Sequence, residues 1–203
     1  MTVARGLTDD QIAGCFNRRL GRRHGVRLIG GAAEPLYEPG SEGGTAIIRY
    51  TRDYAASALH ELAHWCIAGA RRRQLPDYGY WYRPPPRTNA EQSAFYRAEM
   101  PVQALEARLA AAAGLPFRVS VDDLDREPSA ASVAATRRFV EDVQALSDRM
   151  AYQAVSARAA ELEANLRRYR RQVHRSGLSS ATTSTLDNAA VSIAPFADRP
   201  AAA

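Results

Sequence analysis

Apolar residues recur at helical spacing in several parts of the chain. Between the first two of these helical segments, two short runs of residues favour strands. Residues 8–20 form an amphipathic segment, which we expect to end as a helix at Gly21. The runs 26–29 and 45–50 have strand character, and we expect them to be neighbouring strands of one small sheet. The Gly-, Pro- and Glu-rich stretch 30–44 between them is typical of a loop.

A second helix is expected over residues 53–69, and the stretch after it fits neither helical nor strand periodicity. This stretch, 71–87, contains three consecutive prolines, which exclude a helix there. Residues 176–203 consist largely of Ser, Thr, Ala and Pro, a composition typical of disorder. We therefore expect a single domain over residues 1–175 and a disordered tail over 176–203.

The second half of the domain is predicted to be mainly helical. A helix begins near Asn89, a suitable capping residue, and we expect Pro101 to interrupt it because the residue before a proline disfavours α geometry. The helix then resumes and ends at Gly114. Residues 117–121 are a candidate third strand, and the apolar positions in 129–174 predict two more helices. Together these elements predict an α+β fold, with a small β-sheet packed by helices.

Composition narrows the class of protein. The chain has 203 residues, of which 46% are hydrophobic, and no apolar run reaches the roughly 20 residues that a membrane-spanning helix needs. The first residues lack the apolar stretch of a signal peptide, so we expect a cytoplasmic protein without a membrane partner. All 27 basic residues are arginines, but a net charge of +5 is too small to indicate a nucleic-acid partner. Two cysteines, Cys15 and Cys66, cannot form a disulfide framework.

Residues 60–64 read HELAH and fall within the helix predicted over residues 53–69. Two histidines four residues apart lie on one face of a helix, so both imidazoles can reach the same metal ion. Glu61 lies about 100° around the helix from His60, near enough to contact a water on that ion. Such short motifs also occur by chance, but two buried imidazoles need partners, and a metal serves both. The motif predicts a metal site on a central helix, with Glu61 as a catalytic residue.

A site with His60 and His64 needs a third protein ligand. The first four acidic residues that follow the motif are Asp77, Glu91, Glu99 and Glu106. Asp77 lies in the irregular stretch, whereas Glu91 and Glu106 fit exposed helical faces. Glu99 lies among apolar residues beside the predicted helix break, where a buried carboxylate needs a cation. We therefore expect Glu99 to be the third ligand.

A cluster of aromatic residues lies between the predicted metal helix and Glu99. Its members are Tyr78, Tyr80, Trp81 and Tyr82. Aromatic faces in this position can wall a pocket and hold a cationic alkyl chain by cation–π contact, so we expect these residues to bind substrate. The alternative is that they cover the core beneath a long loop.

Several segments resemble the bacterial elongation factor P hydroxylase family. They are residues 60–69 (HELAHWCIAG), 78–82 (YGYWY), Glu99, 103–105 (QAL) and 112–117 (AAGLPF). The resemblance extends from about residue 28 to residue 171, and its first two blocks are together far more specific than the five-residue motif. It implies a fold similar to that of a metal-dependent bacterial endoribonuclease, in which helices pack on a small sheet and the metal lies at the central helix.

The resemblance also implies an activity, which is hydroxylation of the β-lysylated lysine of elongation factor P. His60 and His64 match the histidine ligands of the family, and Glu99 matches its carboxylate. This two-histidine, one-carboxylate set suits a mononuclear Fe(II) with open positions for O₂ and substrate. The order of the ligands differs from that of the 2-oxoglutarate-dependent oxygenases, so the electron donor stays open. Elongation factor P is the expected partner.

A zinc metallopeptidase is the main alternative. Glu61 would then activate a water on Zn(II), and Glu99 would be the third ligand. The sequence around Glu99 lacks the elements usual in such peptidases, which favours the hydroxylase. A metal-dependent RNA hydrolase rests on fold similarity alone, and a non-catalytic binding module would leave an open metal site without a use.

Overall fold

The computed structural model describes residues 6–41, 43–51, 54–80, 86–122, 129–150 and 155–175. The predicted tail, 176–203, and the side chains of Trp81 and Tyr82 lie outside these ranges. No helix in the described part of the chain combines the length and the apolar character that crossing a bilayer requires.

The first helical segment continues past its predicted end at Gly21. It comprises α1 (Asp9–Phe16), a π-helical turn (Asn17–Gly21) and α2 (Arg22–His24). Gly21 keeps right-handed helical dihedrals, and a Cβ there would lie 2.6 Å from the carbonyl oxygen of Val26. Glycine at this position therefore allows the next strand to pack closely. The helix ends instead at Gly25, whose φ of 62° is left-handed.

Three strands form the sheet, in the order β1-β3-β2. β1 (Val26–Ala32) and β3 (Ala46–Thr51) are parallel neighbours, with Leu28 paired to Ile48, which confirms the two predicted strands and their pairing. β2 (Leu36–Glu38) lies antiparallel to β3, inside the stretch that we expected to be a loop. Proline and glycine flank this three-residue strand, so the composition of the stretch predicts a loop. The strand forms because pairing with β3 stabilises it.

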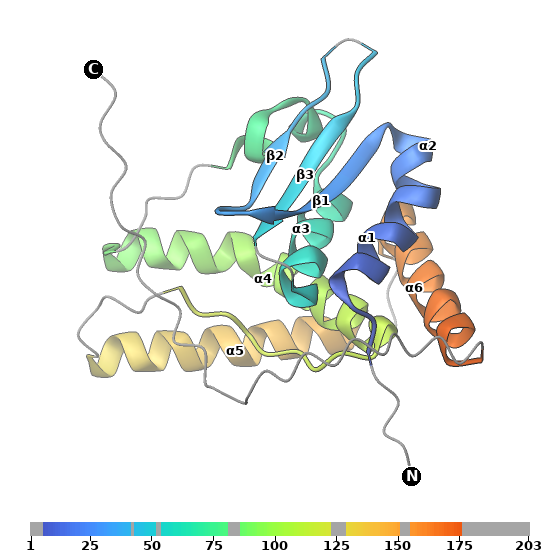
Figure 1. Cartoon of the computed structure of the whole chain (residues 1–203). Coiled ribbons are helices and arrows are strands. Elements are labelled where there is room, and N and C mark those ends of the chain that lie inside the picture. The colour runs from blue at the N-terminus through green and yellow to red at the C-terminus, as the bar shows by residue number, and fades with distance from the viewer. Residues whose placement is uncertain are drawn as a thin grey trace.

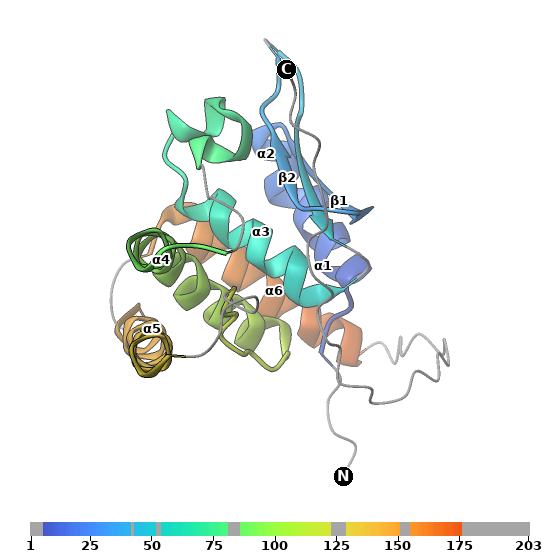
Figure 2. The same cartoon turned by 90° about the vertical axis from the view of Figure 1, so that its left-hand side faces the viewer.

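Helix α3 (Ala55–Ile67) lies between the sheet and α4 (Figure 2). It buries apolar residues on opposite sides, among them Leu59, Leu62 and Trp65, none of which is exposed. The ring of Trp65 meets that of Phe16 edge-on at 5.3 Å. The helix ends at Ile67, two residues before the predicted Gly69, and the guanidinium of Arg158 donates hydrogen bonds to its last carbonyl groups.

Helix α4 (Asn89–Ala113) runs through Pro101 without the predicted break. A proline inside a helix costs about 3 kcal/mol relative to alanine because one backbone hydrogen bond is lost. The apolar residues that follow it, Val102, Leu105 and Leu109, are almost fully buried, and their packing offsets this cost. The N-cap is Thr88, which forms a capping box with Glu91, and not Asn89 as the sequence suggested.

Two helices, α5 (Ala130–Met150) and α6 (Ala157–Arg175), occupy the region in which two were predicted. Figure 1 shows α5 alongside α4. The strand expected at 117–121 does not form. The side chain of Gln103 takes the place of a partner strand: its Nε2 donates to the carbonyl of Ser120 at 3.0 Å, and the Ser120 N–H donates back at 2.9 Å. The described elements confirm an α+β fold with a small sheet and packed helices.

Candidate metal centre

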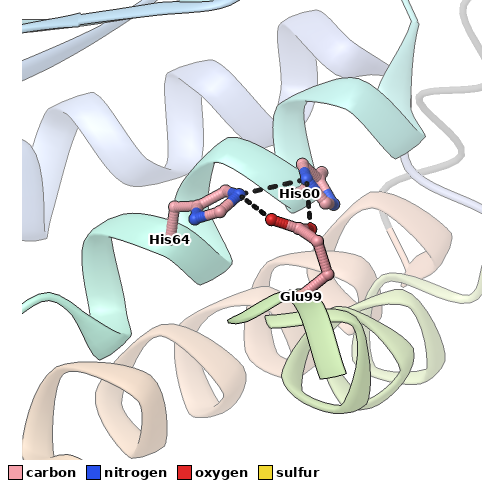
Figure 3. Close-up of side chains that lie close together, drawn as sticks. All are labelled: His60, His64 and Glu99. Atoms are coloured by element: carbon pink, nitrogen blue, oxygen red, sulfur yellow. Dashed lines mark hydrogen bonds and ion pairs between the residues drawn. The ribbon is translucent and has the colours of Figure 1, made fainter. Parts of the chain in front are cut away.

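Helices α3 and α4 bring His60, His64 and Glu99 together, as the sequence predicted (Figure 3). The two imidazole Nε2 atoms lie 3.2 Å apart. Glu99 places one carboxylate oxygen 3.5 Å from Nε2 of His60 and the other 3.6 Å from Nε2 of His64. The Glu99 side chain is only 4% exposed, whereas that of His60 is 26% exposed, so solvent reaches the group from the His60 side.

These distances fit a single metal ion. Ligand atoms at the usual 2.0–2.2 Å from a metal lie about 2.8–3.1 Å from one another in octahedral geometry and about 3.3–3.6 Å in tetrahedral geometry. The three observed separations are within a few tenths of an ångström of these ranges, so little movement would complete the coordination. The donor set, two imidazoles and one carboxylate, is also the one that non-haem iron sites use.

Glu106 is buried, so its predicted place on an exposed helical face is wrong. It is 8% exposed, and its Oε2 accepts a hydrogen bond from Nδ1 of His60 at 2.8 Å. This contact fixes the proton on Nδ1 and leaves Nε2 of His60 directed toward Glu99, as an outer partner of a metal-ligating histidine does. The signal was present in the sequence: Glu99 and Glu106 are seven residues apart, two turns along one face of α4.

The charges around the two histidines give them opposite protonation behaviour. Burial alone would lower the pKa of His60, but its hydrogen bond to Glu106 and the carboxylates of Glu106, Glu99 and Glu61 raise that pKa to about 10. Burial and then the charges of His60 and Arg72 hold the pKa of His64 well below its ordinary value. Three carboxylates thus surround one imidazolium, an excess of negative charge that a divalent cation would neutralise.

Glu61 lies on α3 beside the group without belonging to it. Its side chain is buried, and burial raises the pKa of the carboxyl. The charge of His60 opposes this shift while the neighbouring carboxylates, Glu99 first, add to it, so the pKa reaches about 7. A value near neutrality suits a group that takes and returns a proton. Its catalytic role remains a prediction.

The aromatic segment after α3 packs beside His64. Tyr78 is 3% exposed, with its ring stacked 4.1 Å from that of Tyr37 and parallel to the imidazole of His64 at 6.1 Å. Tyr80 meets His64 edge-on at 5.8 Å and carries the guanidinium of Arg72 over its ring at 3.7 Å. Asp77 accepts a hydrogen bond from the backbone N–H of Tyr37, which anchors this segment, and it lies outside the candidate ligand group. Glu91, the last of the acidic residues considered as a third ligand, caps the start of α4 instead.

The protein is thus an α+β protein with a candidate two-histidine, one-carboxylate metal centre between α3 and α4. A family model described as Elongation factor P hydroxylase matches residues 15–178, and the chain therefore belongs to the elongation factor P hydroxylase family. A similar protein, the elongation factor P lysine hydroxylase of Haemophilus influenzae, is 41% identical over 120 residues, which cover 59% of this chain and 67% of the relative. Neither of these names describes a peptidase.

We expect Glu106 to act on the metal through the orientation of His60. Glu106→Ala should weaken metal affinity about 10- to 100-fold, the usual effect of losing such an outer partner. Glu106→Gln should retain most of the affinity, because its amide oxygen still accepts the proton of Nδ1. Competition with a chromophoric chelator measures both variants. Wild-type affinity in Glu106→Ala would show that His60 needs no such support.

Proposed function

We propose that this protein hydroxylates the β-lysylated lysine of elongation factor P and uses a mononuclear Fe(II) to do so. The observation that carries the proposal is the convergence of His60, His64 and Glu99 in a member of the elongation factor P hydroxylase family. The name of the Haemophilus influenzae relative supports lysine hydroxylation of the same translation factor.

His60, His64 and Glu99 would hold the iron, and the remaining residues would prepare the site around it. When bound, Fe(II) supplies the activation of O₂ that an unreactive C–H bond requires. One oxygen atom enters the C–H bond, and an external two-electron reductant converts the other to water. Glu106 holds the ring of His60, and the buried Glu61 is positioned to accept or return a proton close to the reacting groups.

The aromatic segment would position the substrate side chain. Tyr78 is buried between Tyr37 and His64, so we assign it to holding the segment in place. Tyr80 is partly exposed, and the guanidinium of Arg72 lies over its ring, a contact of the same kind as the one proposed for the substrate cation. We propose that Tyr80, with Trp81 and Tyr82, contacts the cationic alkyl chain of the modified lysine and directs one carbon toward the metal centre.

Intact-protein mass spectrometry tests this function. The protein is loaded anaerobically with Fe(II), mixed with β-lysylated elongation factor P and a reductant, and then exposed to air. We expect the substrate to gain the mass of one oxygen atom, and to gain nothing under nitrogen. A substrate mass that stays unchanged in air, together with cleavage of a peptide panel by the Zn(II)-loaded protein, would favour a peptidase instead.

A matched set of variants tests the role of Tyr80. A cation over an aromatic face gains about 0.5–2 kcal/mol, so Tyr80→Ala should weaken substrate handling about 2- to 30-fold at unchanged metal content. Tyr80→Phe keeps the ring and should retain most of the rate. Tyr54→Ala removes an aromatic residue that is 53% exposed at the start of α3 and serves as the control. Equal rates in all three variants would indicate that Tyr80 covers the core and does not bind substrate.

A further inference from the structure

A hollow of about 120 Å³ lies between the first helical segment and α6, on residues that the metal centre does not use. Figure 1 shows α1 and α6 side by side, and the two helices are in contact. Arg18 and Arg19 line it from the π-helical turn, and Asn165, Arg168 and Tyr169 line it from α6. We call this group of five residues the arginine hollow.

The arginine hollow gathers three exposed positive charges, those of Arg18, Arg19 and Arg168. Within the described ranges, no carboxylate forms an ion pair with Arg18, Arg19 or Arg168. Other arginines around α6 differ in this respect: Arg167 pairs with Glu163, and Arg23 pairs with Glu161. Three guanidinium groups that line one hollow repel one another, and an anion between them would reverse the sign of that interaction.

Asn165 provides a second and independent sign of a ligand. It is 4% exposed and lines the arginine hollow. Its Oδ1 accepts a hydrogen bond from Arg168 at 3.0 Å, but its Nδ2 is buried and has no hydrogen-bond partner in the described part of the chain. A buried amide without a partner is costly, and an acceptor oxygen in the hollow would satisfy it. The guanidinium of Arg18 lies 5.3 Å from the ring centre of Tyr169, a contact that orients it.

We propose that the arginine hollow binds a phosphate group, either as the free ion or as a phosphate monoester. Guanidinium groups bind phosphate through pairs of parallel hydrogen bonds, and the several oxygens of phosphate can receive donors from three arginines and from Asn165 at once. A carboxylate has only two oxygens and one negative charge, so it matches this donor set less well. The hollow has several times the roughly 10–15 Å³ that one water needs, which leaves room for such a group.

Calorimetric titration of the full-length protein with inorganic phosphate at low ionic strength tests the proposal. We expect saturable binding with one phosphate per chain. Arg18→Gln and Arg168→Gln should each weaken it about 10-fold or more, since both remove a charged donor. Arg171→Gln makes the same charge change on an exposed part of α6 outside the hollow and should have little effect. Equal losses in all three variants, or no saturable binding, would overturn the proposal.

Asn165→Leu separates a ligand-binding asparagine from a structural one. It should weaken phosphate binding, yet raise the melting temperature of the phosphate-free protein because the unpartnered amide is gone. Unchanged phosphate affinity in a folded Asn165→Leu protein would contradict the assigned contact.

Adenosine monophosphate is a second probe, which distinguishes a phosphate monoester from the free ion. If the natural ligand is a monoester, adenosine monophosphate should bind at least as tightly as inorganic phosphate. Succinate binding as tightly as phosphate would overturn the phosphate assignment. The Glu99→Gln protein should bind phosphate normally, which separates this site from the metal centre.

Discussion

Glu99→Gln is expected to abolish stoichiometric metal binding. The change keeps the size of the side chain but removes the only carboxylate that lies within 3.6 Å of both Nε2 atoms in the described part of the chain. Loss of a direct ligand should exceed the roughly 100-fold upper effect of losing an outer partner. His64→Ala should have the same result. Metal analysis of the purified proteins by inductively coupled plasma spectrometry measures the occupancy.

A matched carboxylate variant controls for the change in charge. Glu141→Gln makes the same substitution at an exposed position of α5 and should leave metal content at the wild-type level. Full occupancy in Glu99→Gln would remove Glu99 from the ligand set. Glu61 and Glu106, the other two carboxylates whose charges act on His60, would then be the candidates to replace it.

Trp65→Ala is expected to cost about 3–5 kcal/mol of unfolding free energy, a large fraction of the roughly 5–15 kcal/mol that stabilises a typical domain. Trp65 follows His64 directly but faces Phe16 on α1, and none of its surface is exposed. The same helix therefore supplies metal ligands on one face and core packing on another. Chemical denaturation measures the loss.

The folded fraction of Trp65→Ala should still bind one metal per chain, because the substitution leaves the His60 and His64 face unchanged. Leu75→Ala removes a large apolar side chain that is 47% exposed, and its unfolding free energy should change far less. Loss of metal at temperatures where Trp65→Ala remains folded would show that the packing of Trp65 also positions the ligands.

The candidate ligands could be predicted because their arrangement depends on local geometry. Helical periodicity places His60 and His64 on one face of α3, and a carboxylate among apolar residues identifies Glu99. Glu106 fits an exposed helical face when its sequence is considered alone, although its seven-residue distance from Glu99 indicates a shared face. The role of a polar residue on a helix depends on which face the neighbouring helix covers, and sequence alone does not determine this.

Long-range packing explains the errors in the predicted fold. Pro101 stays in α4 because buried neighbours offset the lost hydrogen bond, and β2 forms because β3 offers it a partner. Gln103 satisfies the backbone of Ser120 with a side-chain amide, which no strand pattern reveals. The arginine hollow likewise combines two segments almost 150 residues apart in the chain, and only their contact in the folded protein brings their charges together.

We propose that His60, His64 and Glu99 hold one iron ion and that hydroxylation of elongation factor P depends on it. Mass spectrometry after reaction under isotopically labelled O₂ tests it most directly, with Fe(II)-treated wild-type, Glu99→Gln and Glu141→Gln proteins and β-lysylated elongation factor P as substrate. We predict one labelled oxygen atom on the modified lysine with the wild-type and Glu141→Gln proteins, and none with Glu99→Gln. An unlabelled substrate with the wild-type protein, or equal labelling with Glu99→Gln, would contradict the claim.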